Sequence, residues 1–344
     1  MKKVLAVCAF FAAAVVFSTA AEAREIRIVG SSTVFPFSTT VAEQFGANTR
    51  FSTPIVEATG SGSGIKLFCS GVGRAHPDIA NASRRMKGSE YDLCQANNVS
   101  DIVEVKIGYD GIVLANTKKS ERFSVSKAQI FMALAKEVPM GGRLVENPYE
   151  RWSDIAADLP DLPIQVFGPP PSSGTRDAFV ELAMEGGAME MPMLAEIAEE
   201  DENLFREIAH SLREDGRWID AGENDGAIVQ TLTKNPDALG VFGYSFLAQN
   251  GDRLQGAIVG GVDPSFENIA GGEYRVSRSL YFYLKKAHAG VVEGLPEFIE
   301  EFTSEDAWGE DGYLIEKGLI PLPQEARFSM AETSRGMQPM TARP

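Results

Sequence analysis

The feature that most constrains the fold is a junction that occurs four times, in which an apolar extended run ends in a small polar loop and a helix begins. Each loop carries Ser or Thr, three carry Gly and two carry Arg. The apolar runs predict strands, and the residues after each loop have the apolar spacing of a helix. Strands that alternate with helices predict an α/β architecture with mainly parallel sheets. The four loops are 30–36, 59–64, 83–85 and 170–176.

The loop at 170–176 shows how such a junction can hold an anion. Ser173, Gly174 and Thr175 fall at the N-terminus of the predicted helix, where the first amides have no intrahelical partner and the helix dipole is positive. Gly174 lets a ligand approach the backbone, and Arg176 adds a guanidinium. An ordinary capped helix with a surface arginine explains this one stretch equally well. Four converging termini could surround a tetrahedral oxyanion, which a single helix cannot do.

The order of these motifs resembles that of periplasmic phosphate-binding proteins, the substrate-binding component of the high-affinity (Pst-type) phosphate ABC importer. The resemblance covers roughly residues 25–320. It implies a type II periplasmic-binding-protein fold, in which two α/β lobes are joined by crossover strands and close over a ligand cleft. The motifs that carry it are 30–36 (GSSTVFP), 60–64 (GSGSG), 82–83 (AS), 173–175 (SGT) and 240–244 (GVFGY).

Two long apolar extended runs predict where the chain crosses between lobes. With 344 residues the chain exceeds what one core usually supports, so two lobes are expected. The runs at 105–115 and 275–285 are the candidate crossovers. They predict a discontinuous lobe I and a contiguous lobe II, and the polar tail from 324 onward is expected to be loosely ordered. The predicted boundaries are 24–108 plus 276–344 for lobe I and 109–275 for lobe II.

The resemblance also implies ligand residues, one motif at a time. In the first loop it implies hydroxyl and amide donors, with a one-residue uncertainty about which position aligns with the family's main donor. In the second loop it implies a serine whose glycine neighbours expose the backbone. In the fourth loop it implies the Ser-Gly-Thr run, to which we add the adjoining arginine. The predicted ligand residues of these loops are Ser32, Thr33, Val34, Ser61, Ser173, Gly174, Thr175 and Arg176.

The third loop departs from the family pattern. The family has an aspartate after Ala-Ser, where it accepts the proton of hydrogen phosphate, but here Arg84 follows. A family arginine before Ser-Gly-Thr is likewise replaced by the prolines at 169–171. A bidentate guanidinium at Arg84 suits a dianion. Rejection of sulfate needs a replacement acceptor, for which Asp110 is favoured over Asp177 and Asp225. Structural pairs of Arg84 with Asp110 or of Arg176 with Asp177 are the alternative.

The N-terminal 23 residues predict export. A basic start, an apolar run and an Ala-x-Ala site are typical of a secretory signal peptide. We expect cleavage after Ala23 and release of the mature chain into the periplasm. The later sequence has no apolar run of about 20 residues that could span a membrane. The net charge of −16 argues against a nucleic-acid partner and requires that local donors attract any anion.

Cys69 and Cys94 are the two cysteines outside the predicted signal peptide. In an exported chain such a pair predicts a disulfide, with two free thiols as the alternative. A zinc site would require more ligands, and only His76 is nearby in the sequence.

The motifs favour a binding protein over an enzyme. Each of the three histidines is isolated, no G-x-S-x-G motif surrounds Ser61, and no cofactor motif is present. The sequence therefore predicts a monomer without a cofactor that binds inorganic phosphate and delivers it to an inner-membrane ABC permease. The alternatives are another tetrahedral oxyanion (sulfate, arsenate, molybdate or a phosphonate) and a periplasmic phosphatase.

Overall fold

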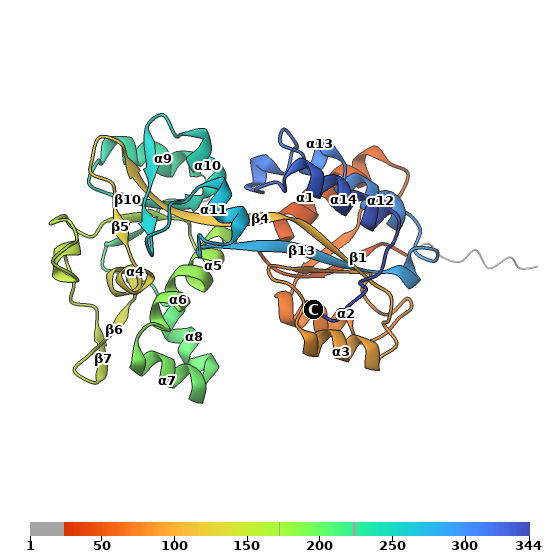
Figure 1. The fold of residues 1–344 in the computed structure, drawn as a ribbon, viewed down its shortest axis with the longest axis horizontal. Helices are drawn as coiled ribbons and strands as arrows, with labels where there is room; N and C mark the ends of the chain where they lie inside the picture. Colours follow the sequence, from red (N-terminus) through yellow and green to blue (C-terminus); the bar gives the residue numbers. More distant parts are fainter. Residues whose placement is uncertain (1–23, 172, 223–224) are drawn as a thin grey trace, which may run out of the picture.

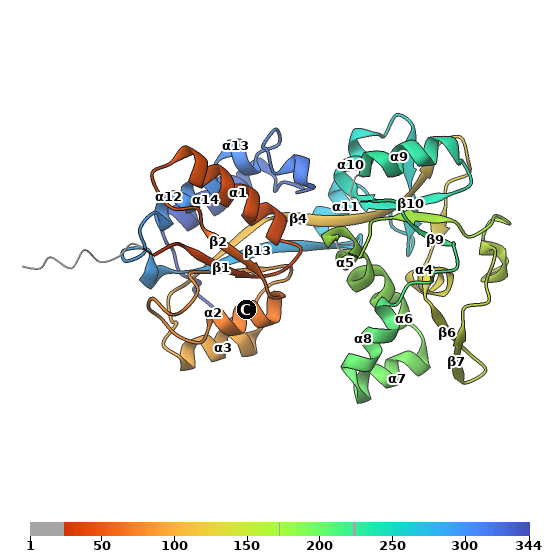
Figure 2. The ribbon, with the colours of Figure 1, turned by 180° about the vertical axis from the view of Figure 1, so that it is seen from behind.

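The structure is a computed structural model that describes residues 24–171, 173–222 and 225–344. The predicted signal peptide, 1–23, lies outside the described residues. Figure 1 shows two α/β lobes bridged by two long strands, β4 (Ile102–Thr117) and β13 (Ser277–Lys285). The view from behind in Figure 2 shows the same two strands linking the lobes. The predicted crossover run at 105–115 falls within β4 and the run at 275–285 overlaps β13, which begins two residues later; the expected α/β class is confirmed.

Lobe I is built on three short parallel strands extended by the crossover strands. Strand β1 pairs in parallel with both β2 and β3, and β13 lies antiparallel between β3 and β4. The strands are β1 (Arg27–Gly30), β2 (Ile55–Ala58) and β3 (Ile79–Ala82). The helices are α1 (Phe35–Asn48), α2 (Ser61–Phe68), α3 (Gly88–Ala96), α12 (Leu295–Phe302), α13 (Glu305–Trp308) and α14 (Gln324–Arg335), with 3₁₀ turns at Lys286–His288 and Ile315–Lys317.

Lobe II continues the sheet from the far half of β4. Strand β10 pairs antiparallel with β4 and parallel with β8, which pairs parallel with β9. The strands are β5 (Ser124–Val125), β6 (Glu137–Met140), β7 (Arg143–Glu146), β8 (Val166–Gly168), β9 (Trp218–Asp220), β10 (Leu239–Gly243), β11 (Leu254–Gly256) and β12 (Ile258–Val259). The helical segments are α4 (Lys127–Leu134), a 3₁₀ turn (Trp152–Asp154), α5 (Gly174–Phe179), a π-helical turn (Val180–Met184), α6 (Glu185–Ala188), α7 (Pro192–Glu200), α8 (Glu202–His210), α9 (Asp225–Lys234), α10 (Tyr244–Gln249) and α11 (Phe266–Gly271).

Helices cover both faces of the lobe I sheet, which explains why its inner parallel strands β1 and β3 are almost entirely buried, whereas the edge strand β2 is mostly exposed. Helices α1 and α12 pack their apolar sides on one face, and α2 and α3 pack on the other. Cys69, at the end of α2, forms a disulfide with Cys94 of α3. The predicted disulfide is therefore confirmed, and it ties together the two helices that cover this face.

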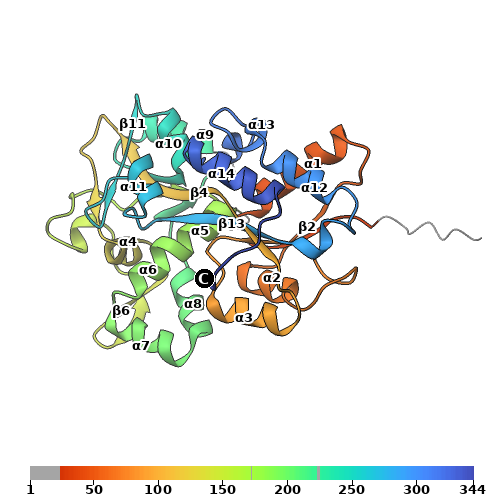
Figure 3. The same cartoon turned by 45° about the vertical axis from the view of Figure 1, so that its right-hand side comes forward.

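The C-terminal tail differs from the expectation of loose order. Residues Gln324–Arg335 form α14, which contacts β4 (Figure 3). The Arg327 side chain is 3% exposed, donates to the Leu322 carbonyl oxygen at 2.7 Å and pairs with Glu305 at 2.9 Å. The tail is polar in composition because ion pairs and hydrogen bonds help to hold α14 in place. A prediction based on the spacing of apolar residues does not detect a helix of this kind.

Candidate anion-binding site

Two cavities lie between the lobes, and the predicted loops line them. The first, here called the α5 cavity, has a volume of about 580 Å³ and receives residues from α1, β4, α5, α10 and the turn at Ile315–Lys317. The second, here called the α2 cavity, has a volume of about 700 Å³ and receives residues from α2, α3, β13 and the helices that follow α5. Residues of both lobes therefore line each cavity, as expected for a cleft that holds a ligand.

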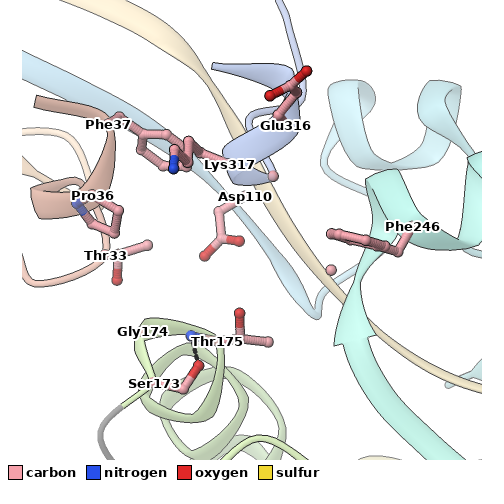
Figure 4. Close-up of a pocket in the computed structure, with 12 residues that line it drawn as sticks. Thr33, Pro36, Phe37, Asp110, Ser173, Gly174, Thr175, Phe246, Glu316 and Lys317 are labelled. Atoms are coloured by element: carbon pink, nitrogen blue, oxygen red, sulfur yellow. Dashed lines mark hydrogen bonds between the residues drawn. The ribbon is translucent and has the colours of Figure 1, made fainter. Parts of the chain in front are cut away.

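The first and fourth predicted loops meet at the α5 cavity. Ser173 has extended backbone angles, and its Oγ accepts from the Thr175 amide at 3.3 Å, which caps α5. A Cβ added to Gly174 would lie 3.8 Å from the Ser32 carbonyl oxygen, so the two loops come close across the cleft. Figure 4 shows Thr33 on one side of the cavity and Ser173, Gly174 and Thr175 on the other.

Neither Val34 nor Arg176 is placed so that its side chain contacts an anion in the cavities directly. The Val34 side chain is fully buried in the lobe I core, so only its backbone could contact an anion. The Arg176 guanidinium donates to Asp220 at 3.1 Å and lies 4.6 Å from the centre of the Trp218 ring. It therefore pairs with β9 of its own lobe and lines neither cavity.

The second and third loops meet at the α2 cavity. Helix α2 begins after Gly60, whose φ of 79° favours glycine. The Ser83 amide donates to Ser61 Oγ at 3.1 Å, and the two hydroxyl oxygens are 3.2 Å apart. Ser61 and Ser83 thus form one polar corner of lobe I that faces the cavity.

Arg84 lines the α2 cavity but already has an anionic partner. Its two terminal nitrogens donate to the Glu90 carboxylate at 2.9 and 2.7 Å, and these hydrogen bonds raise the pKa of Arg84. The Arg84 charge is therefore largely compensated by α3. The alternative pair of Arg84 with Asp110 does not form, because Asp110 pairs with Arg278 instead.

Asp110 lies at the floor of the α5 cavity, where its carboxylate points toward the start of α5 (Figure 4). The side chain is 13% exposed and lies 3.4 Å from Arg278 Nε. Burial raises the pKa of Asp110, and the nearby Arg278 charge opposes this shift without cancelling it. A carboxylate in this place can accept a proton-bearing oxygen of a ligand held by the α5 amides.

Arg278 is the site residue that the sequence analysis missed. Its Nη2 donates to Thr33 Oγ1 at 2.5 Å, and its Nη1 donates to Glu181. Strand β13 runs antiparallel to β4, with Arg278 directly opposite Asp110. The available signal was an arginine inside an otherwise apolar predicted crossover run, but its partner depends on the register of the two strands.

The arrangement supplies donors for an oxyanion alongside several carboxylates and the His210 imidazole. Backbone amides, serine and threonine hydroxyls and Arg278 face the cavities. Within residues 24–171, 173–222 and 225–344, no group of three or more His, Cys, Asp or Glu side chains is placed to hold a metal ion. In the same part of the chain, no helix is long and apolar enough to cross a membrane.

Comparisons with known proteins agree with this geometry. Protein SphX of Synechococcus elongatus is 28% identical over 312 residues, which cover 89% of this chain and 80% of SphX. The phosphate-binding protein PstS of Staphylococcus haemolyticus is 27% identical over 283 residues, which cover 80% of this chain and 75% of that protein. The crystal structure of a possible phosphate binding protein from Planctomyces limnophilus has a TM-score of 0.72 at 27% identity, and covers 92% of this chain and 99% of its own.

A family model described as the PBP superfamily domain matches residues 16–306, which is most of the 344-residue chain. The two lobes, the paired crossover strands and the likeness to the Planctomyces structure identify the type II periplasmic-binding-protein fold. The chain belongs to the PBP superfamily.

Proposed function

We propose that the chain is a periplasmic substrate-binding protein that captures inorganic phosphate between its lobes and delivers it to an inner-membrane ABC permease. The observation that carries the proposal is the meeting of the Ser32–Thr33 backbone with the capped start of α5, with Asp110 between them. Two similar proteins named phosphate-binding or possible phosphate binding protein support this choice of anion.

The proposed ligand set combines donors from both lobes. The amides of Gly174 and Thr175 and the hydroxyls of Thr33 and Ser173 serve from the α5 cavity. The hydroxyl of Ser61 serves from the α2 cavity, and Ser32 and Val34 contribute backbone groups. Arg84 and Arg176 remain in the proposed set, but each would have to leave its present carboxylate partner to reach the anion.

Asp110 is the proposed acceptor for the proton of hydrogen phosphate. Sulfate carries no proton at neutral pH, so its oxygen would face the Asp110 carboxylate without a hydrogen bond between them. A buried acceptor left unpaired costs about 1–3 kcal/mol, and more when it is charged. Asp110 therefore replaces, from a different strand, the aspartate that the family places where this chain has Arg84.

The proposed working cycle is hinge closure. Lobe I (24–108 plus 276–344) and lobe II (109–275) close over the anion by bending at the crossover strands β4 and β13. Closure brings the α5 and α2 donor groups onto one ligand and excludes water, which strengthens each hydrogen bond. The closed monomer, without a cofactor or nucleic acid, is the form that the permease would recognise.

Calorimetry on phosphate-stripped protein tests the proposed function. We expect one phosphate per chain and sulfate binding at least about a hundredfold weaker, because a site built around a ligand proton rejects the analogue that lacks it. Equal affinity for both anions would make the chain a general oxyanion receptor. Absence of heat with either anion would refute the phosphate assignment, and turnover of a chromogenic phosphoester would identify a phosphatase instead.

A further inference from the structure

Arg278 lies between the two groups of proposed ligand donors. It lines the α2 cavity together with Ser61 and Ser83. Its guanidinium also donates to Thr33, which lines the α5 cavity. An anion that contacts donors of both cavities must therefore pass within reach of this side chain. Arg278 is 10% exposed, so its charge is held at the floor of the cleft.

The carboxylate of Glu181 currently occupies the Nη1 side of that guanidinium. Glu181 belongs to the π-helical turn Val180–Met184, which directly follows α5. Such turns insert one residue into a helix and are frequent at functional sites. The Glu181 side chain is 45% exposed, whereas the Asp110 side chain, which faces Nε, is 13% exposed. Of these two carboxylates, Glu181 is the one that solvent can readily hydrate when it leaves.

The Glu181–Arg278 pair crosses from a lobe II helix to the strand that leads back into lobe I. A carboxylate and a phosphate bind a guanidinium in the same way, through parallel N–H···O bonds. The two oxyanions therefore compete for the same donors. Both are also negative, so an anion held at Arg278 would repel a carboxylate that stayed there.

We propose that Glu181 is an internal competitor of the ligand: it occupies Arg278 in the empty cleft, and the incoming anion displaces it as the lobes close. This inference rests on the proposed function and adds two specificity-determining residues to it. Exchange of one anion for another keeps Arg278 paired throughout the cycle. The exchange also limits the affinity, since the apparent Kd is the intrinsic Kd divided by the fraction of molecules in which Arg278 is free of Glu181.

The test is calorimetric titration of the full mature chain with inorganic phosphate in wild type and Glu181→Gln. We expect the variant to bind about threefold to fivefold more tightly, which corresponds to the loss of a half-exposed ion pair. The matched control is Glu185→Gln. Glu185 lies one turn further along the same helical segment, lines the same cavity and pairs with His210 at 2.5 Å. The Glu185→Gln substitution removes the same charge without releasing Arg278.

A second variant pair tests the route through Arg278. In an Arg278→Gln background, adding Glu181→Gln should leave the phosphate Kd unchanged, because the donors under competition are gone. If the Arg278→Gln variant does not fold, the double variant Asp110→Asn/Arg278→Gln serves as the background instead. It also removes the Asp110 carboxylate, which would otherwise be buried without its partner.

The outcomes separate this inference from the proposed function. A wild-type protein that binds no phosphate refutes both. Normal binding by wild type with no gain in Glu181→Gln, an equal gain in Glu185→Gln, or a gain that persists without Arg278 refutes the competitor role alone. A gain confined to Glu181→Gln and dependent on Arg278 supports it.

Discussion

Asp110 and Arg278 are neighbours across a strand pair, and their roles differ although they form one ion pair. In the proposed site Arg278 offers its charge to an anion, whereas Asp110 faces that anion with an acceptor. A site that contained only donors would attract any oxyanion of suitable size. In the proposed site the acceptor adds a requirement for a ligand proton, and we expect this requirement to turn anion binding into recognition of hydrogen phosphate.

Asp110→Asn tests this requirement directly. An amide can donate to a sulfate oxygen, so sulfate binding should become about tenfold tighter or more, while phosphate binding should weaken by about tenfold. Competition titrations with both anions measure the change. Asp263→Asn removes an exposed carboxylate that pairs with Arg122 and lines neither cavity, and it should change neither affinity. Unchanged sulfate binding in Asp110→Asn would assign discrimination to another residue.

Residues that line the cleft were more predictable from the sequence than the carboxylates with which they pair. Asp110 was selected as a candidate acceptor, and the structure places it in the α5 cavity. Arg84 and Arg176 were selected by their place in the loops, but Glu90 and Asp220 hold them. An ion pair depends on which carboxylate the fold brings within about 4 Å, and a one-dimensional pattern does not contain that distance.

At the scale of elements, the strand–loop–helix junctions were the predictable part. Helices α1, α2 and α5 begin at three of the expected loops because small polar residues and glycine there leave the first amides open. The π-helical turn after α5 was not predictable, since its extra residue is tolerated through packing with the neighbouring helices. Helix α14 was missed because its buried Arg327 reads as a polar surface residue.

Arg327→Gln measures how firmly α14 is anchored. Losing the Glu305 pair and the bond to the Leu322 carbonyl should lower the free energy of unfolding by about 2 kcal/mol, the range for hydrogen bonds to charged groups. Urea denaturation gives this value. Arg343→Gln removes a pair with Asp92 whose side chains are 60% and 57% exposed, and it should leave the free energy of unfolding nearly unchanged. Equal effects would mean that burial adds nothing to the Arg327 anchor.

At the scale of the whole molecule, the net charge of −16 acts against the proposed ligand. Two arginines of the cleft are already paired, Arg84 with Glu90 and Arg278 with Asp110 and Glu181, whereas Lys87 and Lys317 also line the cavities. At long range an approaching anion meets the net negative charge of the chain, and the cations of the cleft attract it only at shorter range.

The rate of phosphate association should consequently rise with salt. Between roughly 10 and 150 mM ionic strength the Debye length falls from about 30 to about 8 Å, so repulsion is screened, and we expect an increase of about twofold. Stopped-flow measurements in sodium chloride give the rate, and a matched series with sucrose controls for viscosity. A rate that fell with salt would show that local cations already outweigh the global charge.

The two-lobed plan was predictable because length and two long apolar runs required it, and the runs coincide with β4 and β13. Their mutual register was not predictable, because a bulge between Leu280 and Tyr281 shifts the pairing by one residue. That register brings Arg278 opposite Asp110, so the central charge pair of the site depends on a detail of strand pairing.

The position of β13 between β3 and β4 also fixes the order in which the chain can fold. Strand β13, which lies inside the lobe I part of the sheet, is synthesised after lobe II, and Ile320 and Leu322, which pack in the lobe II core, are made later still. Until Lys285 has been made, β3 and β4 each have an edge that no other strand of the sheet covers. Unpaired edges readily recruit strands from other chains. We therefore expect a chain that stops before Ser277 to aggregate rather than to form one stable lobe.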